Sequence, residues 1–77
     1  MNKALMKSVI VRNDDTQTSL AAALGLPASS LNNRLNGKVD FRVSEITLIR
    51  KRYNLTAEEV TDIFFDDSVS KTDTEGS

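Results

Sequence analysis

The sequence predicts an all-α fold made of five short helices. Apolar residues recur three or four positions apart in several short segments, which is the spacing of one face of a helix. Residues that cap or stop helices separate these segments. No segment shows the strict alternation of apolar and polar residues that marks a strand. We therefore expect the helices to pack around one core.

The first predicted helix spans residues 3–12, with Asn2 as its N-cap, because asparagine side chains accept hydrogen bonds from the first backbone N–H groups of a helix. Residues 13–15 form a polar break. The second helix is predicted over residues 17–24 and is capped by Thr16. The apolar stripes expected to enter the core are Leu5, Met6, Val9 and Ile10, and Leu20, Ala21 and Leu24.

The third predicted helix follows after a very short connection. Gly25 is expected to adopt the left-handed conformation that ends a helix, and Pro27 suits the start of the next one. The third helix is predicted over residues 28–35 and ends at Asn36 and Gly37. Asn-Gly also favours a hairpin turn, but no alternating strands flank it. The inward-facing residues are Leu31 and Leu35.

The fourth and fifth helices complete the predicted domain. Phe41 and Val43 are expected to anchor the preceding loop and the start of the fourth helix in the core. After a break at Asn54, Thr56 and Glu59 form a capping box that opens the fifth helix. The remaining residues expected to face inward are Ile46, Ile49 and Tyr53, with Leu48 partly buried, and Val60, Ile63 and Phe64.

The composition predicts one small domain, residues 1–66, followed by a tail. Residues 67–77 contain one large apolar residue and cannot offset their ordering entropy, so we expect a disordered acidic tail. The net charge of the whole chain is −1, yet residues 1–65 carry nine basic against seven acidic residues. The acidity therefore comes from the tail. This charge distribution permits DNA binding without indicating it.

The residue types argue against an enzyme and against a membrane protein. The sequence holds no histidine and no cysteine, which removes the Ser-His and Cys-His pairs of nucleophilic catalysis and the usual zinc ligands. It holds no glycine-rich phosphate loop. No segment reaches the roughly 20 apolar residues that a membrane span requires. We expect a binding protein without a cofactor, a metal or a membrane partner.

Residues 17–38 carry the functional signal. They read Gln-Thr-Ser-Leu-Ala-Ala-Ala-Leu-Gly-Leu-Pro-Ala-Ser-Ser-Leu-Asn-Asn-Arg-Leu-Asn-Gly-Lys. Two helices joined by so short a turn must cross steeply, and Ala21 is small where the third helix passes close to the second. Gly25 lets the backbone turn without a Cβ penalty. A helix held in this way can enter the major groove of DNA.

This segment resembles the helix-turn-helix of the phage repressor and Cro family, often called the XRE family. Its Gln, Leu-Ala, Leu-Gly, inward Leu and Asn-Gly-Lys elements fall at the intervals of that family, and the resemblance covers residues 5–65. It implies a five-helix lambda-repressor-like DNA-binding domain with the helix-turn-helix at the second and third helices. It also implies the cytoplasm of a bacterial or phage-infected cell. Pro27 departs from the family pattern, in which many members have a Ser or Thr cap.

The resemblance further implies that the third helix reads bases and that residues around it contact phosphates. Asparagine can pair with adenine, serine with several bases, and a small apolar side chain can touch a thymine methyl group. Phosphate contacts position a protein without reading sequence. The candidate base-reading residues are Gln17, Ala28, Ser29, Ser30, Asn32 and Asn33. The candidate phosphate contacts are Thr16, Arg34, Asn36, the Gly37 N–H, Lys38 and Arg42.

Two function classes remain open at this point. One is a transcriptional repressor that binds a double-stranded DNA operator as a homodimer, because one module of this size contacts few phosphates. The other is a protein-interaction module on the same scaffold, either a modulator of another regulator or an antitoxin. The absence of Arg and Gln at the start of the third helix favours this second class. Phe65 lies off the apolar stripe and either makes a dimer contact or folds over the core.

Overall fold

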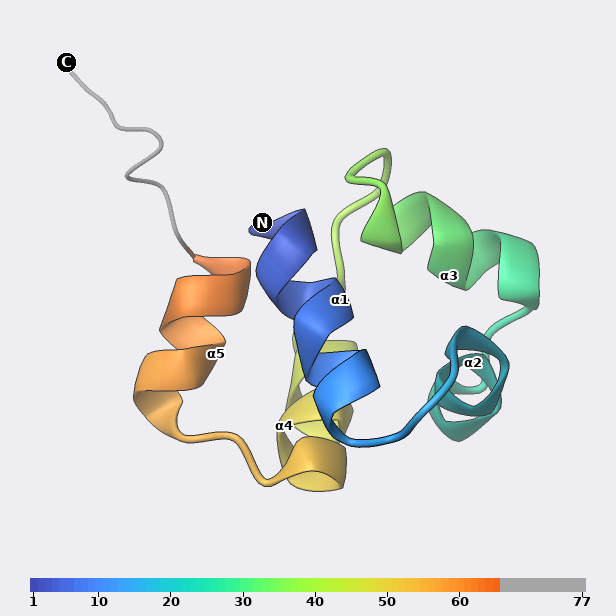
Figure 1. The fold of residues 1–77 in the computed structure, drawn as a ribbon. Coiled ribbons are helices and arrows are strands. Elements are labelled where there is room, and N and C mark those ends of the chain that lie inside the picture. The colour runs from blue at the N-terminus through green and yellow to red at the C-terminus, as the bar shows by residue number, and fades with distance from the viewer. Residues whose placement is uncertain (66–77) are drawn as a thin grey trace, which may run out of the picture.

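The computed structural model describes residues 1–65, which fold into five helices with no strand among them (Figure 1). The prediction of an all-α fold is confirmed, and so are the predicted bounds of the first three helices. None of the helices in this part of the chain combines the length and the hydropathy needed to cross a membrane. The predicted tail lies outside the described residues. The helices are α1 (Lys3–Arg12), α2 (Gln17–Leu24), α3 (Ala28–Leu35), α4 (Val43–Tyr53) and α5 (Ala57–Phe64).

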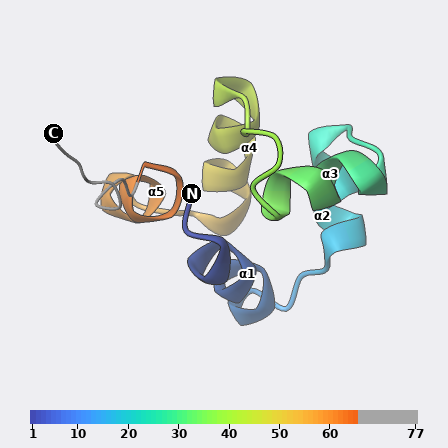
Figure 2. The same cartoon turned by 90° about the horizontal axis from the view of Figure 1, so that it is seen from above.

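The five helices are arranged with α1 and α4 in the middle, α5 on one side and the α2–α3 pair on the other (Figures 1 and 2). In Figure 1, α2 is seen nearly end-on whereas α3 runs across the view, so these two helices cross steeply. The N-terminus lies beside the end of α5, where the Asn2 N–H donates to the Ile63 carbonyl over 2.7 Å. This arrangement leaves α3 at the edge of the domain.

The core takes at least one residue from every helix. Met6, Leu20, Leu31, Ile49 and Ile63 are each at most 1% exposed. Burying side chains of this size stabilises a protein by about 1.5–3 kcal/mol each. Because Leu31 fixes the inner side of α3 in this core, the opposite side of α3 is left to solvent. The other buried apolar residues are Val9, Ile10, Ala21, Leu35, Tyr53 and Leu55.

The capping residues predicted from the sequence define where the helices begin and end. Asn2 and Thr16 accept hydrogen bonds from the backbone N–H three residues later, at 3.0 and 3.1 Å. Thr56 and Glu59 form the predicted capping box, with bonds of 3.1 and 2.9 Å. Gly25 ends α2 with a φ of +70°, a conformation that residues with a Cβ rarely adopt. These local interactions explain why the predicted bounds hold.

Two predictions about α4 are wrong. Val43 was expected in the core but is 79% exposed, and Leu48 was expected to be partly buried but is 45% exposed. The predicted inward residues Ile49 and Tyr53 are buried and Ile46 is half-buried. Glu45, four residues before Ile49, extends the buried stripe to the start of α4. Val43 and Leu48 lie off this stripe, and a buried carboxylate occupies the position nearest the start of the helix.

Candidate nucleic-acid interface

One side of α3 is polar and exposed. Ala28, Ser29, Asn32, Asn33 and Asn36 are all exposed, and their spacing of three or four residues places them on one side of the helix. The serine hydroxyl and the asparagine amides can each donate and accept hydrogen bonds, and none of these side chains is charged. Groups of this kind match the donors and acceptors that base pairs present in the major groove.

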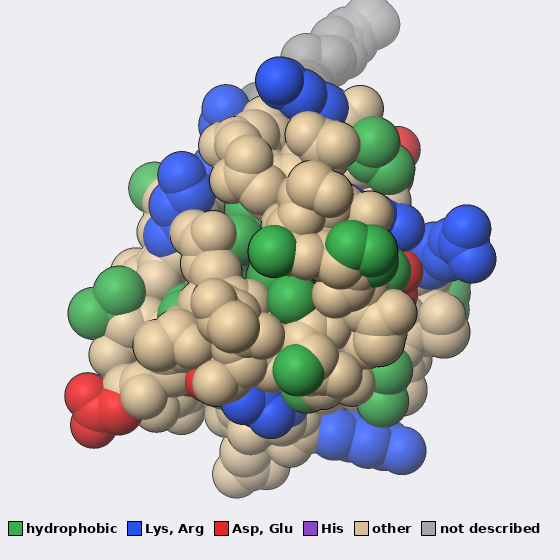
Figure 3. Space-filling view, turned by 90° about the vertical axis from the view of Figure 1, so that its right-hand side faces the viewer, with side chains coloured by type: hydrophobic (Ala, Val, Ile, Leu, Met, Phe, Trp, Pro, Cys, Tyr) green, Lys and Arg blue, Asp and Glu red, His purple; other side chains and the backbone are tan. Residues whose placement is uncertain are grey.

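Figure 3 views the molecule from the side on which α2 and α3 lie. Apolar side chains, together with uncharged polar or backbone atoms, fill the centre of this view. Lys and Arg side chains lie around its margin, and Asp and Glu side chains also lie there, most plainly at the lower left. An uncharged centre is chemically suited to base edges, which are uncharged, and the Lys and Arg side chains at the margin are suited to the anionic phosphates on either side of a groove.

The start of α3 is set by Pro27, which has a φ of −60° and makes no side-chain capping bond. Its carbonyl accepts from the Ser30 and Leu31 N–H groups at 3.0 and 3.2 Å. Ser30 is half-buried. Ala28 and Ser29 therefore form the exposed start of the helix, and Ser30 lies on the flank nearer the core.

Arg34 does not lie on the exposed side of α3. It is 9% exposed, and its Nε donates to Glu45 Oε1 over 2.9 Å, while its Nη1 donates to the Ser30 carbonyl over 3.3 Å. The same Glu45 oxygen accepts the Arg42 N–H at 2.9 Å. The prediction that Arg34 contacts phosphate is wrong, because its guanidinium holds α3 against the start of α4.

The loop after α3 also differs in one detail from the prediction. The Gly37 N–H donates to the Arg34 carbonyl over 3.1 Å, so this N–H is used within the turn and cannot be assigned to a phosphate. The Lys38 N–H donates to the Asn33 carbonyl over 2.9 Å. The side chains of Asn36 and Lys38 remain exposed, as does Arg42 at the start of α4.

The start of α2 brings together the two remaining candidates. Thr16 and Gln17 are both exposed, and α2 packs against α3. The first backbone N–H groups of a helix have no acceptor within it, and the helix dipole makes this end attractive to anions. Such an end can hold a phosphate, with the Gln17 side chain beside it.

A hydrogen-bonded network fixes the chain just before α2. The Asp15 carboxylate accepts two bonds from Arg52, at 2.8 and 3.1 Å, and one from the Tyr53 hydroxyl. These bonds from Arg52 and Tyr53 hold the pKa of Asp15 well below its usual range. Burial, together with the bond to Asp15, raises the pKa of Tyr53 to about 12. The network ties the α1–α2 loop to the end of α4.

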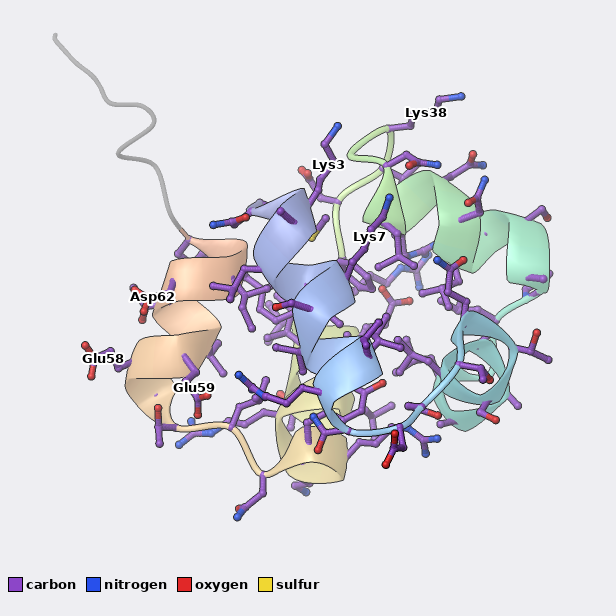
Figure 4. All side chains as sticks on the ribbon, in the orientation of Figure 1. Lys3, Lys7, Lys38, Glu58, Glu59 and Asp62 are labelled. Atoms are coloured by element: carbon purple, nitrogen blue, oxygen red, sulfur yellow. The ribbon has the colours of Figure 1, made fainter. Side chains whose placement is uncertain are left out.

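Two lysines that sequence reasoning did not select lie near the loop after α3. Figure 4 shows Lys3 and Lys7 of α1 on the same side of the molecule as Lys38. Their spacing of four residues was visible in the sequence, but their nearness to Lys38 depends on how α1 packs against α3. The acidic residues of α5 point away from this side (Figure 4), and these are Glu58, Glu59 and Asp62.

A hollow of about 370 Å³ lies between the N-terminus, the loop after α3 and the end of α5. The rings of Phe41 and Phe64 meet edge to face in it, with centroids 5.5 Å apart. Met1, Val39 and Phe65 line it and are 38%, 46% and 56% exposed. Phe65 therefore does not fold over the core, and that alternative is wrong.

Comparison with known proteins places the chain in a family. Residues 3–67, which include all five helices, match DUF739, described as "Protein of unknown function (DUF739)". The chain belongs to this family. Neither the curated proteins nor the solved structures gave a match. The description of DUF739 names no ligand and no activity.

Proposed function

We propose that this chain is a sequence-specific transcriptional regulator of the phage repressor and Cro type. In this proposal α2 and α3 form a helix-turn-helix, and α3 enters the major groove of double-stranded DNA. The observation that carries the proposal is the uncharged polar side of α3, exposed at the edge of the domain while the other side of the helix is buried. The major groove is about 12 Å wide and admits such a helix.

The exposed residues divide into two roles. Ser29, Asn32 and Asn33 read base edges, because their hydroxyl and amide groups can form directed hydrogen bonds there. Lys38 and Arg42, together with the N-terminus of α2, contact phosphates and set the position of the domain on the duplex. Arg34 takes neither role, and it holds α3 in its orientation through Glu45.

The regulator acts as a homodimer on a pseudo-palindromic site, with the two α3 helices about 34 Å apart. The hollow lined by Met1, Val39 and Phe65 is the surface best suited to the contact between copies, because exposed large apolar side chains gather there. Analytical ultracentrifugation on operator DNA should give two chains per site. One chain per site would contradict the dimer.

A second candidate function is a protein-interaction module on the same scaffold, either a modulator of another regulator or an antitoxin. The same apolar hollow and the absence of Arg and Gln at the start of α3 favour it. The two candidates differ in how binding responds to salt. DNA binding weakens steeply as salt rises, because bound phosphates release counterions, whereas the binding of a protein partner need not.

The deciding experiment is selection from a random duplex library at low and at moderate salt. We expect an enriched palindrome whose affinity falls with salt. If the folded protein enriches no sequence, the DNA-binding proposal is wrong and the interaction module takes its place.

Two variants then test the assigned roles on the selected site. Asn33→Ala should change the preference at one base position by about 1–3 kcal/mol. Lys38→Ala should weaken binding to all sequences alike, because a phosphate contact carries no sequence information. If both variants lose the same affinity for every sequence, the assignment is wrong.

A further inference from the structure

We infer that Lys3 and Lys7 of α1 contact the DNA backbone together with Lys38, so that a track of three lysines leads from the end of α3 onto α1. This inference rests on the proposed DNA-binding function and deepens it. Phosphate contacts then come from a helix outside the α2–α3 pair, and the area of contact with DNA is larger than that pair alone would cover.

The three lysines are neighbours in space although they come from two parts of the chain. A Cβ on Gly37 would lie 3.8 Å from the Cδ of Lys3, so the Lys3 stem runs beside the residue before Lys38. Lys7 follows Lys3 by about one helical turn and is therefore on the same side of α1. In Figure 4 Lys7 points toward α3, and Lys3 and Lys38 extend from the same side of the molecule.

The charges of these lysines are available for a partner. The ion pairs found within residues 1–65 join Arg12, Arg34 and Arg52 to carboxylates, and none of them includes a lysine. All three lysines are exposed, and α1 contains no acidic residue. A lysine is a compact point charge on a flexible stem, which suits a phosphate without demanding one geometry.

The track is continuous with the part of α3 proposed to read bases. The Lys38 N–H is bonded to the Asn33 carbonyl, so the track begins one turn from a base-reading residue. A helix in the major groove has a phosphate backbone along each wall of the groove. A duplex lying against the exposed side of α3 therefore brings one backbone to the loop after α3 and to the start of α1.

The start of α1 is firmly held, so its lysines have a fixed origin. The Asn2 side chain caps the helix at the Leu5 N–H over 3.0 Å, and the Asn2 N–H is bonded to the Ile63 carbonyl at 2.7 Å. Holding the helix start reduces the entropy lost when Lys3 meets a phosphate. The contact then depends only on the side-chain torsions of the lysine.

The test compares Lys3→Gln and Lys7→Gln with a matched control, Lys51→Gln. Lys51 is also exposed and lies in the last turn of α4, at the opposite end of the domain from the loop after α3 (Figure 1). Glutamine has nearly the helix propensity of lysine. Thermal unfolding of each variant verifies that the fold is kept.

We expect Lys3→Gln and Lys7→Gln each to weaken binding about fivefold at roughly 0.15 M salt. Each should also make the negative slope of log affinity against log salt shallower by about 0.9. The loss should be the same on the selected site and on a random duplex, and Lys51→Gln should leave both quantities unchanged. If the wild type binds DNA but the α1 variants behave like Lys51→Gln, this inference alone is wrong. If the wild type shows no salt-dependent binding to any duplex, the proposed function fails and this inference fails with it.

Discussion

The two ends of α4 hold neighbouring parts of the molecule by the same kind of pair but in different surroundings. At its start Glu45 binds Arg34 of α3, and these side chains are 8% and 10% exposed. At its end Arg52 binds Asp15 of the α1–α2 loop, and their side chains are 35% and 11% exposed. The first pair sets the orientation of α3, whereas the second sets where α2 begins.

The difference in burial decides how much each pair matters when one partner is lost. A buried pair gains little net stability, because removing both charges from water is unfavourable, but breaking it leaves an uncompensated buried charge. A partly exposed pair is screened, and water can replace the lost partner. We therefore expect the loss in the free energy of unfolding to be largest for the variant of the most buried pair and smallest for the variant of the most exposed pair.

The largest effect is expected for Arg34→Met, which leaves the Glu45 carboxylate buried beside a single backbone donor, the Arg42 N–H. The free energy of unfolding should fall by about 3–5 kcal/mol, as measured by urea denaturation. Arg34→Met combined with Glu45→Gln should recover part of this loss, because no unpaired charge remains. A loss below about 1 kcal/mol in the single variant would show that the pair does not hold α3.

The two ion pairs also show which features could not be predicted from the sequence. The helix bounds could be predicted, because caps such as Asn2, Thr16 and Thr56 act on backbone groups three residues away. The partner of Arg34 is eleven residues away and that of Arg52 is thirty-seven residues away. Such pairs depend on how the helices pack.

The candidate site, too, could be predicted from the sequence only in part. The exposed side of α3 follows from the spacing of Ser29, Asn32 and Asn33 within one helix. The nearness of Lys3 to the loop after α3 could not be predicted, because it depends on the packing of α1 against α3. Val43 was misplaced for a related reason: an apolar side chain was expected inside, but Glu45 takes the inward position because Arg34 neutralises it there.

The next largest effect is expected for Asp15→Asn, which replaces the acceptor of both Arg52 and Tyr53 by a neutral amide. We expect a loss of about 1–2 kcal/mol in the free energy of unfolding, below the usual value for charged hydrogen bonds because Arg52 is partly exposed. Urea denaturation at neutral pH measures it. A loss as large as that of Arg34→Met would contradict the order of burial.

The effect of Asp15→Asn on stability should also depend on pH. The pKa of Asp15 is lower in the folded chain than its ordinary value of 3.8. The stabilisation is therefore fully present above pH 3.8 and is lost as the pH falls through the lower folded pKa. The difference in stability between wild type and Asp15→Asn should shrink in this acid range. A difference that stays constant down to low pH would show that the Asp15 charge is not its source.

A smaller effect is expected for Tyr53→Phe, which keeps the buried ring and removes the bond to Asp15. The loss should be about 1 kcal/mol at neutral pH. Because the pKa of Tyr53 is raised from 10.0 to about 12, its contribution is present below pH 10 and is lost as the pH rises through 12. The wild type should therefore lose its advantage over Tyr53→Phe between pH 10 and 12. An advantage that persists above pH 12 would contradict this assignment.

The smallest effect is expected for Arg12→Gln, which removes the pair between α1 and α5. The Arg12 and Glu59 side chains are 56% and 39% exposed, and their closest atoms are 3.4 Å apart. Water and salt screen such a pair, and Glu59 keeps its capping bond to the Thr56 N–H. The midpoint of urea denaturation should not change measurably at physiological salt. A shift equal to that of Asp15→Asn would mean that exposure does not separate these pairs, and that the contact between α1 and α5 depends on charge rather than on the core beneath it.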